Sequence, residues 1–412
     1  MDKQLLQKYA DFVVKAGVNV QPGQALILRC PVLGAEFGRA CMRAAFEAGA
    51  RDVLLRYEDE QAARIRMDKA SEEALTHPMP SELRSYLDYA ESEGGVCVLN
   101  IHADDPEIFK GLDAGKIHRV EVARRTFMRP WQEYTMKDKV QWCVVSIPTP
   151  AWAAAVYPDL APDEAVEALW DTIFAVCRVK GGDPVAAWRQ HTAQTTARKD
   201  RLNALDLASI HLTSANGTDL TVGLAEGAVW EGAASTAQNG ADFIPNIPTE
   251  EVFTAPHKDR VNGVVKGTKP YAYNGEVIEG FSVTFKDGRV VEHSAQKNDA
   301  LLGRLLASDA GACRIGEVAL VPASSPINQS GLLFYNTLFD ENAACHIAFG
   351  EAYPCLEGGQ QMSKDELKAR GLNDSITHVD FMIGTPDLSI VGTTRDGEEV
   401  PIFIDGNFAP AF

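Results

Sequence analysis

Residues 25–57, ALILRCPVLGAEFGRACMRAAFEAGARDVLLRY, contain the pattern that predicts the fold of the N-terminal half. Residues 25–28 are continuously apolar and follow a Pro-Gly turn, which is typical of a buried strand. Residues 35–48 have a helical pattern that ends at Gly49, and residues 53–57 form a second expected strand. The stretch therefore predicts a strand, a helix and another strand in succession.

The same alternation continues along the first half of the chain. Further strands are expected at residues 96–101 and 140–147, and helices near residues 81–92 and 163–179. Alternating strands and helices predict an α/β fold in which helices cover both faces of a mostly parallel sheet. No Gly-x-Gly-x-x-Gly follows the first strand, so we expect a scaffold or a wall of the active site rather than a cofactor-binding domain.

A change of pattern near residue 200 predicts a second domain. After an expected helix at residues 185–205, short β-branched segments are separated by hairpin turns, and Lys286-Asp287-Gly288 is a strong signal of this kind. An antiparallel or mixed sheet with a few helices is expected there. We therefore predict an N-terminal α/β domain at residues 1–200 and a C-terminal α+β domain at residues 201–412.

Composition restricts the classes of partner. The 412 residues include 39 Lys+Arg against 57 Asp+Glu, a formal charge of -18. Such a surface repels nucleic acid and anionic membranes and favours a cationic ligand, such as a free peptide amino terminus, although an acidic surface also serves solubility alone. The N-terminus has no leader pattern, and no run of about 18 apolar residues occurs. Eight cysteines without a Cys-x-x-Cys favour reduced, buried thiols and a cytoplasmic location.

Two segments of the second half combine ionisable residues with a strand-like apolar pattern. His378 and Asp380 are two apart in ITHVDFMI, so a strand would place both side chains on one face, able to reach one metal ion or to face solvent. Glu317 lies in RIGEVALVP, where a buried carboxylate needs a metal ion or an arginine, unless it faces outward from an edge strand. Gly316 before it would allow close approach of another backbone or a ligand.

Two further segments carry the remaining candidates. Glu250 and Glu251 are adjacent in NIPTEEVF, and on an extended chain they point in opposite directions, so both can serve one site only where the chain bends. Neighbouring surface glutamates are the alternative. His346 in ENAACHIAFG is either a ligand or a hydrogen-bonded core residue. Tyr353 either donates a hydrogen bond to an oxyanion or fills space.

Taken together, two imidazoles and three carboxylates are a standard donor set for two divalent ions, and two ions that share a water are typical of a hydrolase. The segments 246–256, 315–322, 338–353 and 377–384 closely resemble the aminopeptidase T/aminopeptidase S family of bacterial metallopeptidases, and the similarity runs along the whole chain. In that family a two-metal centre lies in the C-terminal domain. The resemblance implies the metal ligands Glu250, Glu317, His346, His378 and Asp380.

The resemblance also implies a homodimer whose active sites face an internal cavity. We therefore expect a metal-dependent aminopeptidase that acts on peptides with a free amino terminus and uses two divalent ions (zinc, cobalt or manganese) per subunit. In this hypothesis Glu317 is the ligand that bridges the two ions. Glu250 and His346 complete the shell of one ion, and His378 and Asp380 complete the shell of the other.

The same hypothesis assigns the proton transfers. Glu251 would be the general base, and Tyr353 would stabilise the tetrahedral oxyanion. Two alternatives stay open on the sequence alone. One is another binuclear hydrolase, such as a dipeptidase or an amidase, and the other is a non-catalytic scaffold stabilised by metal.

Overall fold

The computed structural model describes residues 2–103, 105, 107–273 and 276–412. The chain divides into two compact units: unit 1 comprises Met1–His191 and Ala234–Pro248, and unit 2 comprises Thr192–Ala233 and Thr249–Phe412. The long helix α9 (Pro184–Ala204) leads from the first unit into the second. The division into domains 1–200 and 201–412 stays a prediction about independent folding.

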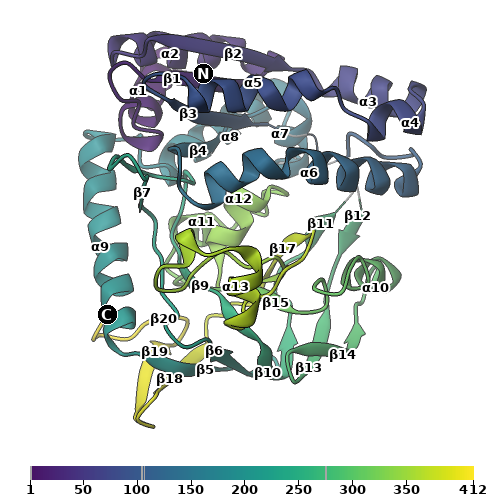
Figure 1. Ribbon diagram of the computed structural model, residues 1–412, viewed down its shortest axis with the longest axis vertical. Helices are drawn as coiled ribbons and strands as arrows, with labels where there is room; N and C mark the ends of the chain where they lie inside the picture. The colour runs from purple at the N-terminus through teal and green to yellow at the C-terminus, as the bar shows by residue number, and fades with distance from the viewer. Residues whose placement is uncertain (1, 104, 106, 274–275) are drawn as a thin grey trace. The chain divides into compact units, whose positions relative to one another are not determined.

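Unit 1 contains a four-stranded parallel sheet in the order β2-β1-β3-β4. Its strands are β1 (Ala25–Pro31), β2 (Asp52–Glu58), β3 (Val96–His102) and β4 (Trp142–Ser146). The two central strands are almost entirely buried, which explains their continuous apolar sequences, because both faces of a parallel sheet are covered. The predicted parallel sheet is confirmed (Figure 1).

Helices pack on both faces of this sheet. On one face Ile27 and Val98 pack with Tyr86 of α5 (Pro80–Glu91) and Trp131 of α6 (Ala114–Met136). A second group of helices is joined by stacked and edge-to-face aromatic rings, those of Tyr9, Phe37 and Phe174. These rings belong to α1 (Lys3–Phe12), α2 (Ala35–Glu47) and α8 (Pro162–Val176). The other α-helices and β-strands described in unit 1 are α3 (Glu60–Lys69), α4 (Glu72–Thr76), α7 (Pro150–Val156), β7 (Ser235–Thr236) and β8 (Asp242–Phe243).

The first predicted helix ends where the sequence indicated. Helix α2 stops at Glu47, and Gly49 has a φ of +94°, a left-handed conformation that glycine adopts without strain. The following strand begins three residues later. Gly49 thus ends the helix and lies in the short connection, residues 48–51, that leads into β2.

Unit 2 contains a larger antiparallel sheet in the order β14-β13-β10-β6-β5-β18-β19-β20. The hairpin predicted at Lys286-Asp287-Gly288 joins β13 (Ser282–Lys286) to β14 (Arg289–Ser294), and both Asp287 and Gly288 have positive φ, as a tight hairpin turn requires. The remaining strands of this sheet are β5 (Leu207–Thr213), β6 (Asp219–Leu224), β10 (Pro256–Lys266), β18 (Ser389–Thr394), β19 (Glu399–Ile404) and β20 (Asn407–Phe408).

A second, four-stranded antiparallel sheet of unit 2 carries the candidate site. Its order is β17-β16-β15-β9, and its strands are β9 (Val252–Thr254), β15 (Ile315–Leu320), β16 (His346–Gly350) and β17 (His378–Met382). The other α-helices and β-strands described in unit 2 are α10 (Asp299–Leu306), α11 (Pro326–Gln329), α12 (Thr337–Asp340), α13 (Lys364–Ala369), β11 (Tyr271–Tyr273) and β12 (Glu276–Ile278).

The register of this sheet separates polar from apolar side chains. Ala348 of β16 lies opposite Glu317 on one side and Asp380 on the other, so these carboxylates share a face. The alternate residues Val318, Ile347 and Phe381 point to the opposite face and belong to the main hydrophobic core of unit 2. One face of the sheet is thus committed to packing, and the other is available for chemistry.

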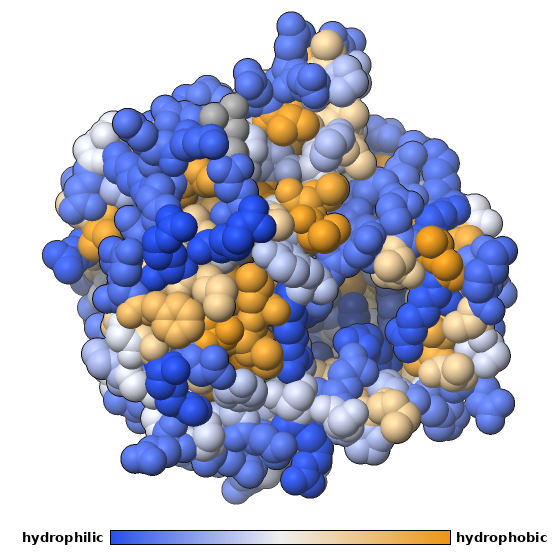
Figure 2. Space-filling view, turned by 90° about the horizontal axis from the view of Figure 1, so that it is seen from above, coloured by the Kyte–Doolittle hydropathy of each residue, from blue (hydrophilic) through white to orange (hydrophobic). Residues whose placement is uncertain are grey.

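The surface agrees with the acidic composition. Figure 2 shows a face on which hydrophilic residues predominate and hydrophobic residues form separate patches. Within the described part of the chain, no helix has both the length and the apolar character needed to cross a bilayer.

Candidate metal centre

Four segments of unit 2 bring ionisable side chains together. Glu251 directly precedes β9, Glu317 lies on β15, His346 begins β16, and His378 and Asp380 lie on β17. All but His378 are buried, and the side chain of His378 is 29% exposed. The site therefore sits on the polar face of the four-stranded sheet, with an opening on the β17 side.

The distances define a compact cluster around His346. Its Nε2 lies 3.3 Å from Oε2 of Glu251 and 3.4 Å from Oε1 of Glu317. One ligand atom from each of these three residues lies within 4.8 Å of the other two. A single cation could contact all three groups.

A second group continues from the same Glu317 side chain. Nε2 of His378 lies 3.6 Å from Oε2 of Glu317 and 3.4 Å from Oδ1 of Asp380. The two carboxylate oxygens of Glu317 therefore face different imidazoles. This is the arrangement expected of a carboxylate that bridges two cations.

Backbone carbonyls orient both imidazole rings. Nδ1 of His346 donates to the carbonyl of Glu341 at 2.9 Å, and Nδ1 of His378 donates to the carbonyl of Glu351 at 2.8 Å. Because a carbonyl only accepts, Nδ1 carries the hydrogen in each ring, and Nε2 is directed at the carboxylates. Metal-binding histidines are held in the same way.

Gly316 contributes to this orientation. A Cβ at this position would overlap the carbonyl oxygens of Gly350 and Glu351. The close backbone approach predicted for Gly316 is therefore confirmed, and it places β15 against the same carbonyl that orients His378.

Electrostatics show that the cluster requires positive charge. Burial opposes a charge on His378, but Asp380 and Glu317 outweigh burial and raise the pKa of His378 to about 10. The pKa of His346 is also raised well above its usual value, because Glu251 and Glu317 outweigh burial. Protons on the rings supply the positive charge in the metal-free protein, and divalent cations suit the same oxygen and nitrogen donors. The residues present thus fit a metal centre.

The two adjacent glutamates have different surroundings. Glu251 belongs to the cluster with Glu317 and His346. Glu250 is buried, its backbone N–H donates to Oδ1 of Asn342 at 2.8 Å, and its charge acts on Arg198 of α9. The structure thus brings Glu251, rather than Glu250, into the group of three donors; the assignment of Glu250 as a ligand stays a prediction.

Tyr353 lies at the edge of the same centre. Its ring is 5.6 Å from the ring of His378, at an interplanar angle of 79°, and it also packs edge-on against Phe253. Burial raises the pKa of Tyr353 well above its usual value, and the charge of Glu317 adds to the effect. The phenol therefore keeps its hydrogen and can donate it.

The sequence interpretation missed Glu341. Burial raises its pKa well above the usual value, and the charges of Asp380 and Glu251 raise it further, so this carboxyl group lies within electrostatic range of the cluster. Glu341 begins the segment ENAACHIAFG, which looked like an apolar wall around His346. The one available signal was that an acidic residue lies five positions before that histidine. A spacing of five residues matches neither the period of a strand nor that of a helix, so it does not predict that the two side chains meet.

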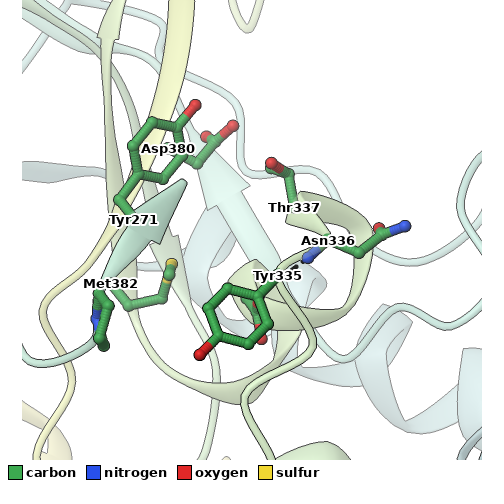
Figure 3. A pocket seen from close by; sticks show the side chains of 8 residues that line it. Tyr271, Tyr335, Asn336, Thr337, Asp380 and Met382 are labelled. Atoms are coloured by element: carbon green, nitrogen blue, oxygen red, sulfur yellow. Dashed lines mark hydrogen bonds between the residues drawn. The ribbon is translucent and has the colours of Figure 1, made fainter. Parts of the chain in front are cut away.

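A small pocket adjoins Asp380 on the polar face. Figure 3 shows the side chains of Asp380 and Tyr271 on one side of it and those of Asn336 and Thr337 on the other. Asp340 also lines this pocket, and its carboxylate accepts backbone hydrogen bonds from Phe334 and Asn336. Acidic and hydroxyl groups next to the cluster provide acceptors for a cationic group.

The fold and the site together point to a class of protein, a hydrolase that carries carboxylate and imidazole groups suited to metal on one face of an antiparallel sheet. The family model described as "Thermophilic metalloprotease (M29)" matches residues 2–408. The chain is 47% identical to "Aminopeptidase 2" of Geobacillus stearothermophilus, over 98% of this chain and 97% of that protein. It is 42% identical to "Aminopeptidase AmpS" of Bacillus subtilis, over 98% of each chain.

A solved structure agrees. The structure titled "Wild-type AmpT from Thermus thermophilus" matches with a TM-score of 0.91 and 39% identity, over 99% of each chain. The chain belongs to the M29 family of metalloproteases. The predicted resemblance, fold class and enzyme class, a metalloaminopeptidase, are thereby confirmed.

Proposed function

We propose that the protein removes amino-terminal residues from peptides with the help of two divalent ions bound in unit 2. The observation that supports two ions, rather than one, is the side chain of Glu317, whose two oxygens face His346 and His378 separately. A buried carboxylate shared in this way is the natural bridge of a binuclear centre. We propose zinc, cobalt or manganese, because all three accept these donors.

The proposed ligands follow the distances. Glu317 would be shared by both ions, Glu251 and His346 would hold one of them, and His378 and Asp380 would hold the other. The sequence hypothesis, in which Glu250 is the ligand and Glu251 the general base, stays a second prediction; the present proposal chooses Glu251 because its carboxylate is the one beside Nε2 of His346. Glu341 is proposed as a further carboxylate of the centre, since its pKa responds to Asp380 and Glu251.

The protein groups around the ligands have separate tasks. When bound, the two ions would acidify a shared water and polarise the peptide carbonyl. The hydroxyl of Tyr353 would donate a hydrogen bond to the oxyanion, because burial keeps it protonated. The acceptors around the small pocket beside Asp380 would hold the free α-amino group of the peptide, which limits cleavage to the first residue.

We also propose a cytoplasmic homodimer. Seven of the eight cysteines, all of them described residues, are buried, which is consistent with the reduced thiols of a cytoplasmic protein. The homodimer is proposed from the family resemblance, and its mass in solution is the test.

Two matched variants, Glu251→Gln and Glu250→Gln, test the ligand assignment. We expect Glu251→Gln to lower both the bound metal, measured by elemental analysis, and the release of p-nitroaniline from Leu-p-nitroanilide with added Zn²⁺, Co²⁺ or Mn²⁺. Glu250→Gln should retain its metal. A Glu251→Gln protein with full metal content and no turnover would instead make Glu251 the general base. Full activity of the chelated wild-type protein would overturn the metal-dependent function itself.

A further inference from the structure

Unit 2 contains a second, larger cavity of about 470 Å³. This volume is in the range of small-molecule sites, roughly 300–1,000 Å³. Most of its wall is small or apolar, including Ala323, Ala344 and Leu388. Nothing in the proposed chemistry at the metal centre uses this space.

Among the described residues that line the cavity, Lys269 is the one with a charged side chain. Within the described part of the chain, no carboxylate lies within ion-pair distance of its ammonium group. Its field nonetheless reaches Asp340 of the small pocket, where it lowers the pKa against the larger effect of burial. Lys269 therefore lies between the cavity and the pocket beside the metal centre.

Thr268, the neighbour of Lys269, adds a hydrogen-bonding group to the same wall. Its Oγ1 is buried and has no hydrogen-bond partner among the described residues. A buried hydroxyl without a partner is unfavourable, so a rotation of the Thr268 side chain toward the cavity, where it could donate to an acceptor, would be stabilised by the new hydrogen bond. The backbone of Thr268 is held in place, because its N–H donates to the carbonyl of Met382 at 2.9 Å.

The hydrogen bond between Thr268 and Met382 also allows an estimate of the distance between Lys269 and Asp380. Met382 is two residues beyond Asp380 on β17, roughly 7 Å along the strand, and Thr268 lies about 5 Å to its side, one strand spacing away. An extended peptide spans about 3.3–3.6 Å per residue. The distance from Asp380 to the neighbourhood of Lys269 thus corresponds to a chain of two or three residues.

We propose that Lys269 and Thr268 bind the free α-carboxylate of a di- or tripeptide whose amino end lies beside Asp380. The inference rests on the proposed aminopeptidase function and names its substrate class. Acidic groups meet the ammonium end of the peptide, and a cation meets its carboxylate end. Longer peptides, and peptides with a blocked C-terminus, lose the contact with Lys269.

The test compares the tripeptide Leu-Gly-Gly with its C-terminal amide. Wild-type enzyme loaded with Zn²⁺, Co²⁺ or Mn²⁺ is expected to show a kcat/KM at least tenfold higher for the free acid. Lys269→Met should lower kcat/KM about tenfold for the acid, mainly through KM, and leave kcat/KM for the amide unchanged, because the amide has no carboxylate for Lys269 to bind. Tenfold corresponds to about 1.4 kcal/mol of binding free energy. Lys269→Arg, which retains the charge, should keep most of the preference.

Lys266→Met is the matched control. Lys266 is the last residue of β10, three positions before Lys269, and does not line the cavity, so its removal should change neither substrate. Equal hydrolysis of acid and amide by the wild type, or equal loss for both in Lys269→Met, would overturn the carboxylate site while leaving the aminopeptidase function intact. Failure of every form to release leucine from either peptide would instead overturn the proposed function, and the inference with it.

Discussion

The parallel sheet of unit 1 and the four-stranded sheet of unit 2 use burial in different ways. Strand β1 is almost entirely buried because helices cover both faces of its sheet, and its buried residues are apolar or cysteine. Strand β16 is buried over its whole length, yet it carries His346. The difference is that one face of the second sheet packs into the hydrophobic core, while the other face carries the carboxylates that lie near His346. Ionisable groups are tolerated in a buried strand when neighbouring strands supply their partners.

The largest effect is expected from the residue shared by both imidazoles. Glu317→Gln keeps the shape of the side chain but removes the charge that faces His346 and His378. We expect turnover of Leu-p-nitroanilide to fall by more than about a hundredfold, beyond what the loss of an outer-shell partner costs. Metal content should fall as well, while the chelated variant should still unfold cooperatively in urea, which shows that it remains folded. Unchanged turnover would mean that the polar face is not the catalytic face.

The opposite face should respond in the opposite way. Phe381 packs against Tyr271, Phe281 and Phe349 in the core, one residue after Asp380. Phe381→Ala should lower the free energy of unfolding by about 3–5 kcal/mol, as for other large core aromatics. Metal bound per folded molecule should stay close to that of the wild type. Denaturant unfolding and elemental analysis on the same samples measure the two quantities. A loss of metal without a loss of stability would contradict the separate roles of the two faces.

A smaller effect concerns pH. In the metal-free protein the pKa of His378 is raised to about 10, so its imidazolium stabilises the fold fully below its unfolded pKa of about 6.5, and this contribution is lost as the pH rises through about 10. Metal binding has the reverse dependence, because the ring must first release its proton.

Metal affinity should therefore increase with pH below about 10, by up to about tenfold per pH unit for each proton released. Calorimetric titration in buffers of different ionisation enthalpy counts those protons. An affinity independent of pH would show that the polar face does not exchange protons for metal.

Much of the fold could be predicted because its signals are local. The apolar run at residues 25–28, the helix ended by Gly49 and the hairpin at Asp287-Gly288 depend on neighbours along the chain, and all three are present. The spacing of His378 and Asp380 likewise predicted a shared face, since the period of a strand is two residues. The glycine at position 316 within an expected strand likewise predicted the close approach of another backbone segment.

Other features depend on contacts between distant segments. Which of Glu250 and Glu251 approaches His346 depends on how the chain enters β9, and adjacent residues give no local signal for that choice. Glu341 reaches the centre from a turn before β16, outside any periodic pattern. The chain also returns to unit 1 through Ala234–Pro248, which no change in composition marks.

The sequence by itself determined the strands and helices, the metalloprotease family and the residue types of a metal centre, because periodicity and motif are properties of consecutive residues. Only the tertiary structure decided that the two oxygens of Glu317 face different imidazoles, and that Lys269 lies between a cavity and the pocket beside Asp380. The physical reason is that strand register and loop packing convert separations of many residues into distances of a few ångströms.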